Sequence, residues 1–401
     1  MRLGLTYTEL NKMVIFQQNE YLCKKIDLKI AVNTRLLINN RLDGIGRFSA
    51  ETLRRMAIAH PEHEFHFIFD RQFDKDFVFS DNVYPYVIPP QARHPLLYLM
   101  WFEVSVPLLF RRIKPDLFVS PDGYLSLRTR VPSVAVIHDL NFEHYPKDLP
   151  WMVSRYYRRM FPRFARKASR IATVSEYSKK DIIQRYLVDH QKIDVVYNGV
   201  SSHFHPLSEA EQESVRRSFS SNKPYFLFVG SLNPRKNLKN LFLAFDEFKK
   251  KDNKDIKLIV AGARMWWTDD MRFTYENMQY RNDVIFTGRV SDSELVKLVA
   301  SALALTYVSG FEGFGIPILE AFQCKTPVIT SNVTSMPEVA GDAAIQVNPF
   351  DIGEITDALQ RIAVESGLRT ELVRKGEEQC LKFSWDRSAD LLWKCIEKAL
   401  S

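Results

Sequence analysis

Short runs of apolar residues alternate with longer helical patterns along most of this chain, and this alternation constrains the fold more than any other feature. It is typical of β-α-β units, in which parallel strands form a sheet covered by helices. The sequence therefore predicts an α/β fold. The runs expected to be strands lie at 28–33, 65–69, 117–120, 133–139, 170–175 and 193–199, and then at 225–230, 256–262, 283–288, 302–308, 326–331 and 343–348.

A polar, serine-rich stretch at 207–222 separates the two series of predicted strands, and part of it is expected to be a short helix. A chain of 401 residues is long enough for two domains. We expect two Rossmann-like, doubly wound domains at 27–205 and 206–385, with an amphipathic helix over 386–401 completing the first. Residues 1–26 lack the pattern of a signal peptide and are expected to be a poorly ordered lead-in.

Composition narrows the class of protein. With 46% hydrophobic residues, the chain can form sizeable cores, which excludes disordered and low-complexity classes. The four cysteines form no CxxC pair, so neither a disulfide scaffold nor a structural zinc site is expected. The net charge is +7, with +9 in the first 205 residues and −2 in the remainder. This asymmetry indicates an anionic partner for the first half.

Two segments of the first half leave a membrane contact open. The segment 95–110 is strongly apolar, but Glu103 and Pro107 interrupt it and it is too short to span a bilayer. It is expected to be either a buried helix or an element that enters a membrane surface. The segment 151–170 holds seven Lys and Arg residues and no acid. Either it forms a solvated helix face or it meets anionic phospholipid or a polyprenyl-diphosphate-linked acceptor.

The segment 309–324 carries the most informative chemistry, and its sequence is SGFEGFGIPILEAFQC. Its glycines allow the backbone to approach a ligand, and the proline at 317 is typical of a first helical turn. A helix start presents free N–H groups and a positive dipole end, which attract phosphate. Glu312 and Glu320 lie on either side of this anion site, and carboxylates bind hydroxyl groups. The pattern favours a diphosphate with hydroxyl groups on both flanks, as in a nucleotide sugar.

A second phosphate motif, FVGSLNPRKNL, covers 228–238. A predicted strand ends there at Gly230 and is followed by Arg235 and Lys236. Arginine supplies bidentate contacts to phosphate and lysine a point charge. The sequence therefore predicts that these two residues bind a diphosphate.

The spacing of Glu312 and Glu320 resembles the E-x7-E element of the retaining glycosyltransferases of the GT-B fold, specifically the large family four. The surrounding sequence GFEGFGIPILEAFQCKTPVITSNVTSMPEVAGDAAI looks like that family nearly word for word, and similar motifs extend over roughly 28 to 398. The resemblance implies a GT-B fold, with two Rossmann-like domains facing a cleft and a C-terminal helix that crosses back to the first. The segment FSWDRSA is similar to the family's final tryptophan segment, and its Trp385 is expected to be a packing residue.

The resemblance also implies roles for particular residues. DGIGRF matches the family's glycine-rich loop, IHD the strand end that contacts the donor sugar, and FTGRVSDSEL the region around the base. Many relatives have an arginine after the glycine at 230, where this chain has Ser231. The expected catalytic residues are Glu312, His138, Lys236 and Arg235. The expected donor-binding residues are Glu320, Gly313, Phe314, Gly315, Ile316, Pro317, Gly230, Ser231, Arg289, Val290, Gly44 and Gly46, with Asp139 expected to bind the acceptor.

The expected function is transfer of a hexose, with retention of anomeric configuration, from a nucleoside-diphosphate sugar to a saccharide or lipid-linked saccharide in surface polysaccharide assembly. The similar family members are often mannosyltransferases, so GDP-mannose is the expected donor. The resemblance implies no metal and no cofactor. We expect a cytoplasmic chain, and whether it also lies on the inner face of the cell membrane stays open.

Two other functions remain open from the residues. A nucleotide-binding protein without catalysis would share the same phosphate motifs. The pair Gly44-x-Gly46 with Asp70 mimics the fingerprint of an NAD-dependent oxidoreductase, but Ser49 replaces the third glycine and the loop before it is too long. Nucleic acid is not an expected partner, because the chain contains no motif that reads RNA or DNA.

Overall fold

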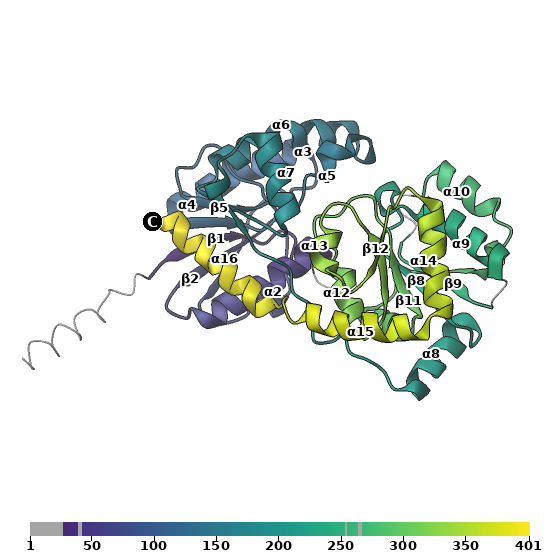
Figure 1. Ribbon diagram of the computed structural model, residues 1–401. Coiled ribbons are helices and arrows are strands. Elements are labelled where there is room, and N and C mark those ends of the chain that lie inside the picture. The colour runs from purple at the N-terminus through teal and green to yellow at the C-terminus, as the bar shows by residue number, and fades with distance from the viewer. Residues whose placement is uncertain (1–26, 39–41, 253–254, 264–266) are drawn as a thin grey trace, which may run out of the picture.

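The computed structural model describes residues 27–38, 42–252, 255–263 and 267–401. It contains a sheet of seven strands and a sheet of six, each with helices on both faces (Figure 1). All neighbouring strands are parallel. The predicted fold of two Rossmann-like domains is confirmed. The expectation for residues 1–26 lies outside the described residues.

The first sheet has the strand order β3-β2-β1-β4-β5-β6-β7 and the second the order β10-β9-β8-β11-β12-β13. In both sheets the order reverses beside the first strand, which is the doubly wound arrangement. The strands are β1 (Lys29–Asn33), β2 (Glu64–Phe69), β3 (Val83–Val87), β4 (Leu117–Ser120), β5 (Ser133–Val136), β6 (Arg170–Thr173), β7 (Ile193–Val195), β8 (Tyr225–Val229), β9 (Lys257–Ala261), β10 (Val284–Gly288), β11 (Ala304–Tyr307), β12 (Val328–Ser331) and β13 (Ile345–Val347).

The helices of the first domain are α2 (Gly44–Ala59), α3 (Pro95–Met100), α4 (Val106–Ile113), α5 (Asn141–His144), α6 (Trp151–Lys167) and α7 (Glu176–Tyr186). Those of the second domain are α8 (Glu209–Ser220), α9 (Leu238–Asp252), α10 (Asp269–Glu276), α11 (Asp292–Ala300), α12 (Ile316–Gln323), α13 (Met336–Ala340), α14 (Ile352–Val364) and α15 (Ser366–Cys380). Short turns are η1 (Lys75–Phe77), η2 (Trp101–Ser105), η3 (Pro146–Asp148), η4 (His190–Lys192), η5 (Pro234–Lys236) and η6 (Arg281–Asp283). No helix of the described residues is both long and apolar enough to span a membrane.

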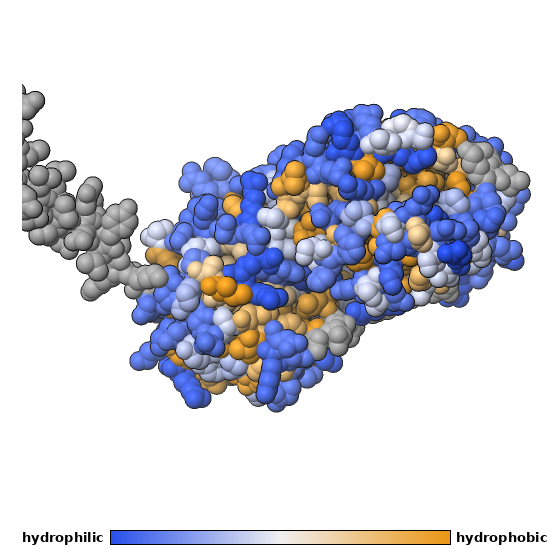
Figure 2. All heavy atoms as spheres, turned by 90° about the horizontal axis from the view of Figure 1, so that it is seen from below, coloured by the Kyte–Doolittle hydropathy of each residue, from blue (hydrophilic) through white to orange (hydrophobic). Residues whose placement is uncertain are grey.

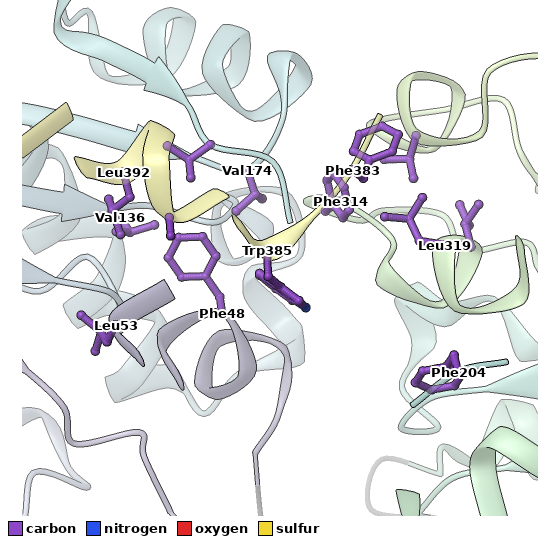
Figure 3. Close-up of a cluster of buried hydrophobic side chains, with 14 of the residues drawn as sticks. Phe48, Leu53, Val136, Val174, Phe204, Phe314, Leu319, Phe383, Trp385 and Leu392 are labelled. Atoms are coloured by element: carbon purple, nitrogen blue, oxygen red, sulfur yellow. The ribbon is translucent and has the colours of Figure 1, made fainter. Parts of the chain in front are cut away.

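The last helix, α16 (Trp385–Leu400), returns to the first domain and packs against α2 (Figure 1). Ion pairs fix it there between Arg55 and Asp386 and between Lys398 and Asp194. One buried hydrophobic cluster continues through both domains. Figure 3 shows Phe48 and Leu392 on the first domain's side of it, Phe314 on the second domain's side, and Trp385 where the chain passes from α15 into α16. The crossing helix thus joins the two cores.

Two local features of the structure differ from the predictions, and one prediction left partly open is confirmed. Strand β3 was not among the predicted strands. It contains Pro85 and is an edge strand, where a missing N–H is tolerated. The helix expected within the polar stretch at 207–222 is confirmed as α8, which begins with a capping box between Ser208 and Glu211. Gly44 and Gly46 lie in the first turn of α2 and not in a loop, because the side chain of Asp43 caps that helix.

Candidate functional site

The candidate site lies where the strand order of the second sheet reverses. Strands β8 and β11 are neighbours at that point, and sheets of this kind bind ligands there, beyond the carboxyl ends of the strands. The chain after β8 forms η5, which contains Arg235 and Lys236. The chain after β11 forms the glycine-rich loop before α12. The fold therefore brings the two predicted phosphate motifs to the same edge of one sheet.

The start of α12 is open to an anion. Gly315 precedes this helix at φ +106°, in the left-handed region that favours glycine. Pro317 lies in the first helical turn, where the helix needs no N–H from it. Pro317 has no N–H, and Ile318 donates its N–H to the carbonyl oxygen of Gly315 at 3.0 Å. The amide of Ile316 is therefore the one in this turn that the helix does not use, and the helix dipole favours negative charge beside it. Phe314 is buried under the loop, whereas Ile316 and Pro317 are partly accessible.

Glu312 forms an ion triad with the two cations of η5. One carboxylate oxygen lies 2.6 Å from Lys236 Nζ and the other 3.2 Å from Arg235 Nη1. Arg235 also donates to the carbonyl oxygen of Phe311 at 3.0 Å, and Lys236 donates to the hydroxyl oxygen of Tyr307 at 2.7 Å. The triad has a net charge of +1 and both cations are held in fixed positions beside the open end of α12.

Burial and charge act in opposite directions on these groups. Burial alone would raise the pKa of Glu312, but the charges of Lys236 and Arg235 outweigh it and lower that pKa to about 2. Burial lowers the pKa of Lys236 more than Glu312 raises it. The pKa of Arg235 is raised, because its neighbouring carboxylates outweigh the burial. Glu312 therefore stays ionised throughout the physiological range.

Glu320 has the opposite electrostatic state. Its side chain is buried in α12, and we find no hydrogen bond or ion pair to its carboxylate in the described part of the chain. Burial raises its pKa to about 7; the charge of Arg47, from the first domain, lowers the pKa and that of Asp292 raises it. A buried carboxylate of this kind is ready to accept hydrogen bonds from a ligand, and strongly shifted groups of this kind gather at functional sites.

The glycine-rich loop is pressed against the first domain. A Cβ on Gly313 would lie 2.8 Å from both the carbonyl oxygen of His138 and the Cβ of Asp139, so only glycine fits without displacing them. Ser175, at the start of α7, donates to the carbonyl oxygen of Gly313 at 2.7 Å. The structure thus brings the predicted residues of the first domain into contact with those of the second.

His138 and Asp139 follow the end of β5. His138 Nε2 donates to the carbonyl oxygen of Pro121 at 2.8 Å, which leaves Nδ1 as an acceptor. Burial lowers its pKa, although the bond to Pro121 and nearby carboxylates raise it. Asp139 accepts from the backbone N–H of Asn141 at 2.9 Å and so caps the turn that leads into α5. The imidazole of His138 packs edge-on against Phe48, with 5.0 Å between the ring centroids, and it is the backbone carbonyl of His138 that lies beside Gly313.

The remaining predicted residues lie around this centre. Gly230 directly follows β8 and faces the side chain of Lys236, and Ser231 is exposed beside it. Arg289 and Val290 connect β10 to α11, with Arg289 exposed. Asp292, at the start of α11, pairs with Arg47 of α2 at 3.1 Å, which places the helix that begins at Gly44 beside α11.

Three contributors were not predicted. Arg47 and Glu338 lie in quoted motifs and Tyr307 lies in the predicted strand at 302–308, but no spacing in the sequence indicates their partners. Tyr307 fixes Lys236, and Arg47 acts on Glu320. The Glu338 carboxylate accepts from the backbone N–H groups of Glu176 and Tyr177, at 2.8 and 3.2 Å, and from the hydroxyl of Tyr197 at 2.7 Å. A carboxylate of the second domain thereby caps α7 of the first.

A cavity of ≈ 520 Å³ opens between the domains beside Arg235. Its polar lining includes Tyr145 and Asp148 from the first domain and Asn233 from the second. Burial raises the pKa of Asp148, although the charge of Arg235 lowers it. The cavity offers a second ligand a place next to the cation pair.

One group of described residues could hold a metal ion, namely His60, Glu62 and His63. It lies beyond the opposite end of α2 from Gly44, with His60 stacked on Trp393 at 3.6 Å between ring centroids. It is separate from the site around Glu312.

Comparison with known proteins gives two family matches that together cover most of the chain. Residues 42–204 match the model described as Glycosyltransferase Family 4, and residues 210–379 match the model described as Glycosyl transferases group 1. The boundary between the two matches falls just before α8.

Two relatives and one solved structure illustrate the similarity. The chain is 29% identical to the O-antigen chain mannosyltransferase B of Escherichia coli, over 86% of this chain and 93% of that one. It is 31% identical to the O-antigen chain mannosyltransferase RfbU of Salmonella typhimurium, over 56% and 59%. Its fold is similar to that of Anabaena Alr3699/HepE in complex with UDP and glucose, with a TM-score of 0.71, 16% identity, and coverage of 92% and 99%.

Proposed function

Because the chain belongs to glycosyltransferase family 4, we propose that it transfers a hexose from a nucleoside-diphosphate sugar to a hydroxyl of a saccharide or lipid-linked saccharide, with retention of configuration. The observation that carries this proposal is the juxtaposition of Arg235, Lys236 and the open start of α12 between two buried carboxylates. Mannosyltransferases of O-antigen chains are among the relatives, which supports GDP-mannose as donor and surface polysaccharide as product.

In this mechanism the bond between the sugar's anomeric carbon and the diphosphate oxygen breaks, and its electron pair leaves with the diphosphate. Arg235, Lys236 and the amide of Ile316 at the start of α12 stabilise the charge that develops there, without a metal or a cofactor. The acceptor hydroxyl attacks from the same face, and its proton passes to the departing phosphate oxygen. The acceptor enters through the cavity beside Arg235. The turn that Asp139 caps forms one side of that cavity.

The carboxylates and the histidine hold the donor's hydroxyl groups. Glu312 accepts from the sugar and Glu320 from the ribose, while Nδ1 of His138 accepts from the sugar on the side of the first domain. Gly44, Gly46 and Ser231 allow the backbone to approach the diphosphate, and Arg289 and Val290 flank the base.

A thermal-shift panel of UDP-, GDP-, ADP- and dTDP-sugars tests donor binding, because a ligand that binds only the folded state raises its stability by mass action. We expect one nucleotide to raise the unfolding temperature, and we expect Glu320→Ala to weaken that ligand's binding without unfolding the chain. If no nucleotide sugar shifts the unfolding temperature, the proposal is wrong. Binding without release of nucleoside diphosphate in the presence of a membrane extract would instead favour a non-catalytic binder.

A further inference from the structure

The segment from α3 to α4 exposes only apolar side chains. Between residues 95 and 110, the exposed residues are Leu96, Met100, Val104 and Leu108, with 62, 53, 46 and 56% of their surface accessible. The other side of the same segment is buried in the core of the first domain, through Trp101, Phe102, Val106 and Phe110 among others. A helix facing water normally has polar residues on its outer side, so this segment departs from the pattern of a solvated helix.

These four residues, which we call the α3–α4 stripe, are spaced four apart. In a helix with 3.6 residues per turn such a row drifts around the axis. The chain widens at η2, a π turn in which the N–H of Val106 donates to the carbonyl oxygen of Trp101. A π turn places more residues in each turn, so it counteracts the drift and helps keep the four side chains on one side. Single exposed apolar residues are ordinary, and Figure 2 shows many among hydrophilic ones on another face. An aligned row marks an interaction surface.

Basic residues surround the stripe. Arg93 is exposed before it, and Arg111, Arg112 and Lys114 are exposed after it. Its single acid, Glu103, is turned inward and accepts from the backbone N–H groups of Leu127 and Arg128 at 2.9 and 3.2 Å. The surface therefore combines apolar side chains with positive charge and offers no outward carboxylate within the stripe.

Helix α6 also combines exposed apolar side chains with exposed basic ones. It is joined to α3 by the rings of Tyr98 and Tyr156, 5.6 Å apart, and Figure 1 shows the two helices on the same side of the first domain. Trp151 and Met152 are exposed at its start, at 71 and 48%. Every further exposed residue of α6 is an arginine, namely Arg155, Arg158, Arg159, Arg163 and Arg166.

We propose that the α3–α4 stripe docks the first domain onto an anionic phospholipid bilayer, with α6 beside it at the headgroups. Apolar side chains enter the boundary between headgroups and acyl chains, and basic residues attract the anionic surface. A second copy of this chain fits the stripe less well, because symmetric pairing would bring the flanking basic residues of both copies together. The proposal extends the proposed function to the lipid surface but needs no donor, so the two can fail separately.

Vesicle co-sedimentation of the whole chain tests this, with phosphatidylcholine alone compared with phosphatidylcholine containing phosphatidylglycerol. We expect binding only to the anionic vesicles, and weaker binding as salt screens the charges. The stripe variant Met100→Ser, Val104→Ser, Leu108→Ser should lower binding by roughly tenfold or more, as should Arg111→Glu with Arg112→Glu. Matched controls on the second domain are Phe273→Ser, Val364→Ser, Leu381→Ser and Arg217→Glu with Arg374→Glu, whose residues are also exposed. These controls should bind as the unaltered chain does.

Equal binding to neutral and anionic vesicles would overturn the proposal. So would stripe variants that keep full binding, or second-domain controls that lose as much. If the serine variant instead turns a dimer into a monomer while vesicle binding stays unchanged, a second copy covers the stripe and the proposal is wrong. Because the altered side chains are all exposed, every variant is expected to fold. A thermal unfolding transition measured for each variant checks this.

Discussion

At the scale of single residues, the two carboxylates around the start of α12 are in opposite electrostatic states. Glu312 is held ionised by two cations, with a pKa of about 2. Glu320 is buried without such partners, and its pKa is about 7. Because a shifted pKa changes how folding depends on pH, the two residues are expected to contribute to stability with opposite signs.

Replacing Glu320 by Gln is expected to stabilise the protein at pH 8. The ordinary pKa of this group is 4.5 and the folded value about 7. Between these values the folded state holds a proton that the unfolded state has lost, so stability falls as pH rises through this window. Gln mimics the protonated form and avoids that loss. The free energy of unfolding should rise by up to about 3 kcal/mol at pH 8 and by much less at pH 5. Urea denaturation at both pH values measures it; a gain as large at pH 5 would contradict the assignment.

Replacing Glu312 by Gln at pH 8 is expected to have the opposite effect. It leaves Lys236 and Arg235 beside each other without their carboxylate, and removing one member of a buried ion pair costs about 3–5 kcal/mol. The stability that Glu312 provides is present above its ordinary pKa of 4.5 and would be lost only as pH falls toward about 2. The same urea titrations compare the two variants, and equal signs at pH 8 would contradict the triad.

The spacing of Glu312 and Glu320 predicted that both would lie near the start of a helix. The seven residues between them span one loop and the first turn of the helix that follows, and such local structure can be predicted from the sequence. It could not predict that Glu312 faces Lys236, which is 76 positions earlier in the chain, or that Tyr307 fixes that lysine. Such partners depend on which strands become neighbours, and only the strand order of β8 and β11 supplies them.

At the scale of elements, the backbone N–H groups at the start of α7 find hydrogen-bond acceptors in both domains. Ser175 accepts from the N–H of Ser178 within its own domain, whereas Glu338 accepts from the two N–H groups before it. A carboxylate at a helix start is favoured by the dipole and by charge-assisted hydrogen bonds. The start of α7 therefore has all of these hydrogen bonds only when the two domains are in contact.

Replacing Glu338 by Ala is expected to open the start of α7. The loss of a cap costs roughly 1–2 kcal/mol, so hydrogen exchange at the amides of Glu176 and Tyr177 should accelerate by about tenfold. Asp351, which caps α14 within the second domain, supplies the control variant Asp351→Ala. If both variants leave these two amides equally protected, the contact of Glu338 with α7 does not protect the start of that helix in solution, and the interpretation is wrong.

Strands were the most predictable elements, because a buried parallel strand appears as a short apolar run whatever surrounds it. The expected runs at 117–120 and 225–230, for example, became β4 and β8. Prediction failed where tertiary context decides. Pro85 is tolerated only because β3 is at the sheet's edge, and Asp43 starts a helix where the glycines suggested a loop.

At the scale of the whole molecule, charge and function are divided between the domains. The first 205 residues carry +9, yet the cation pair of the proposed donor site lies in the half with −2. The basic excess of the first domain is exposed largely on α6 and around the α3–α4 stripe. The sequence predicted an anionic partner for this half, but only the structure shows that the charge lies beside an aligned apolar surface.

The central claim is that Lys236 belongs to a site that transfers a sugar from a nucleotide. The most direct measurement follows release of nucleoside diphosphate and sugar incorporation into a membrane extract, with the donor selected by thermal shift. Lys236→Ala should lower turnover by about 10²–10³-fold, and more than it lowers stability. Lys239→Ala, on the neighbouring α9 and paired with Asp270 at the surface, should turn over as the unaltered chain does. The product should keep the donor's anomeric configuration. Unchanged turnover in Lys236→Ala, or an inverted product, would contradict the account.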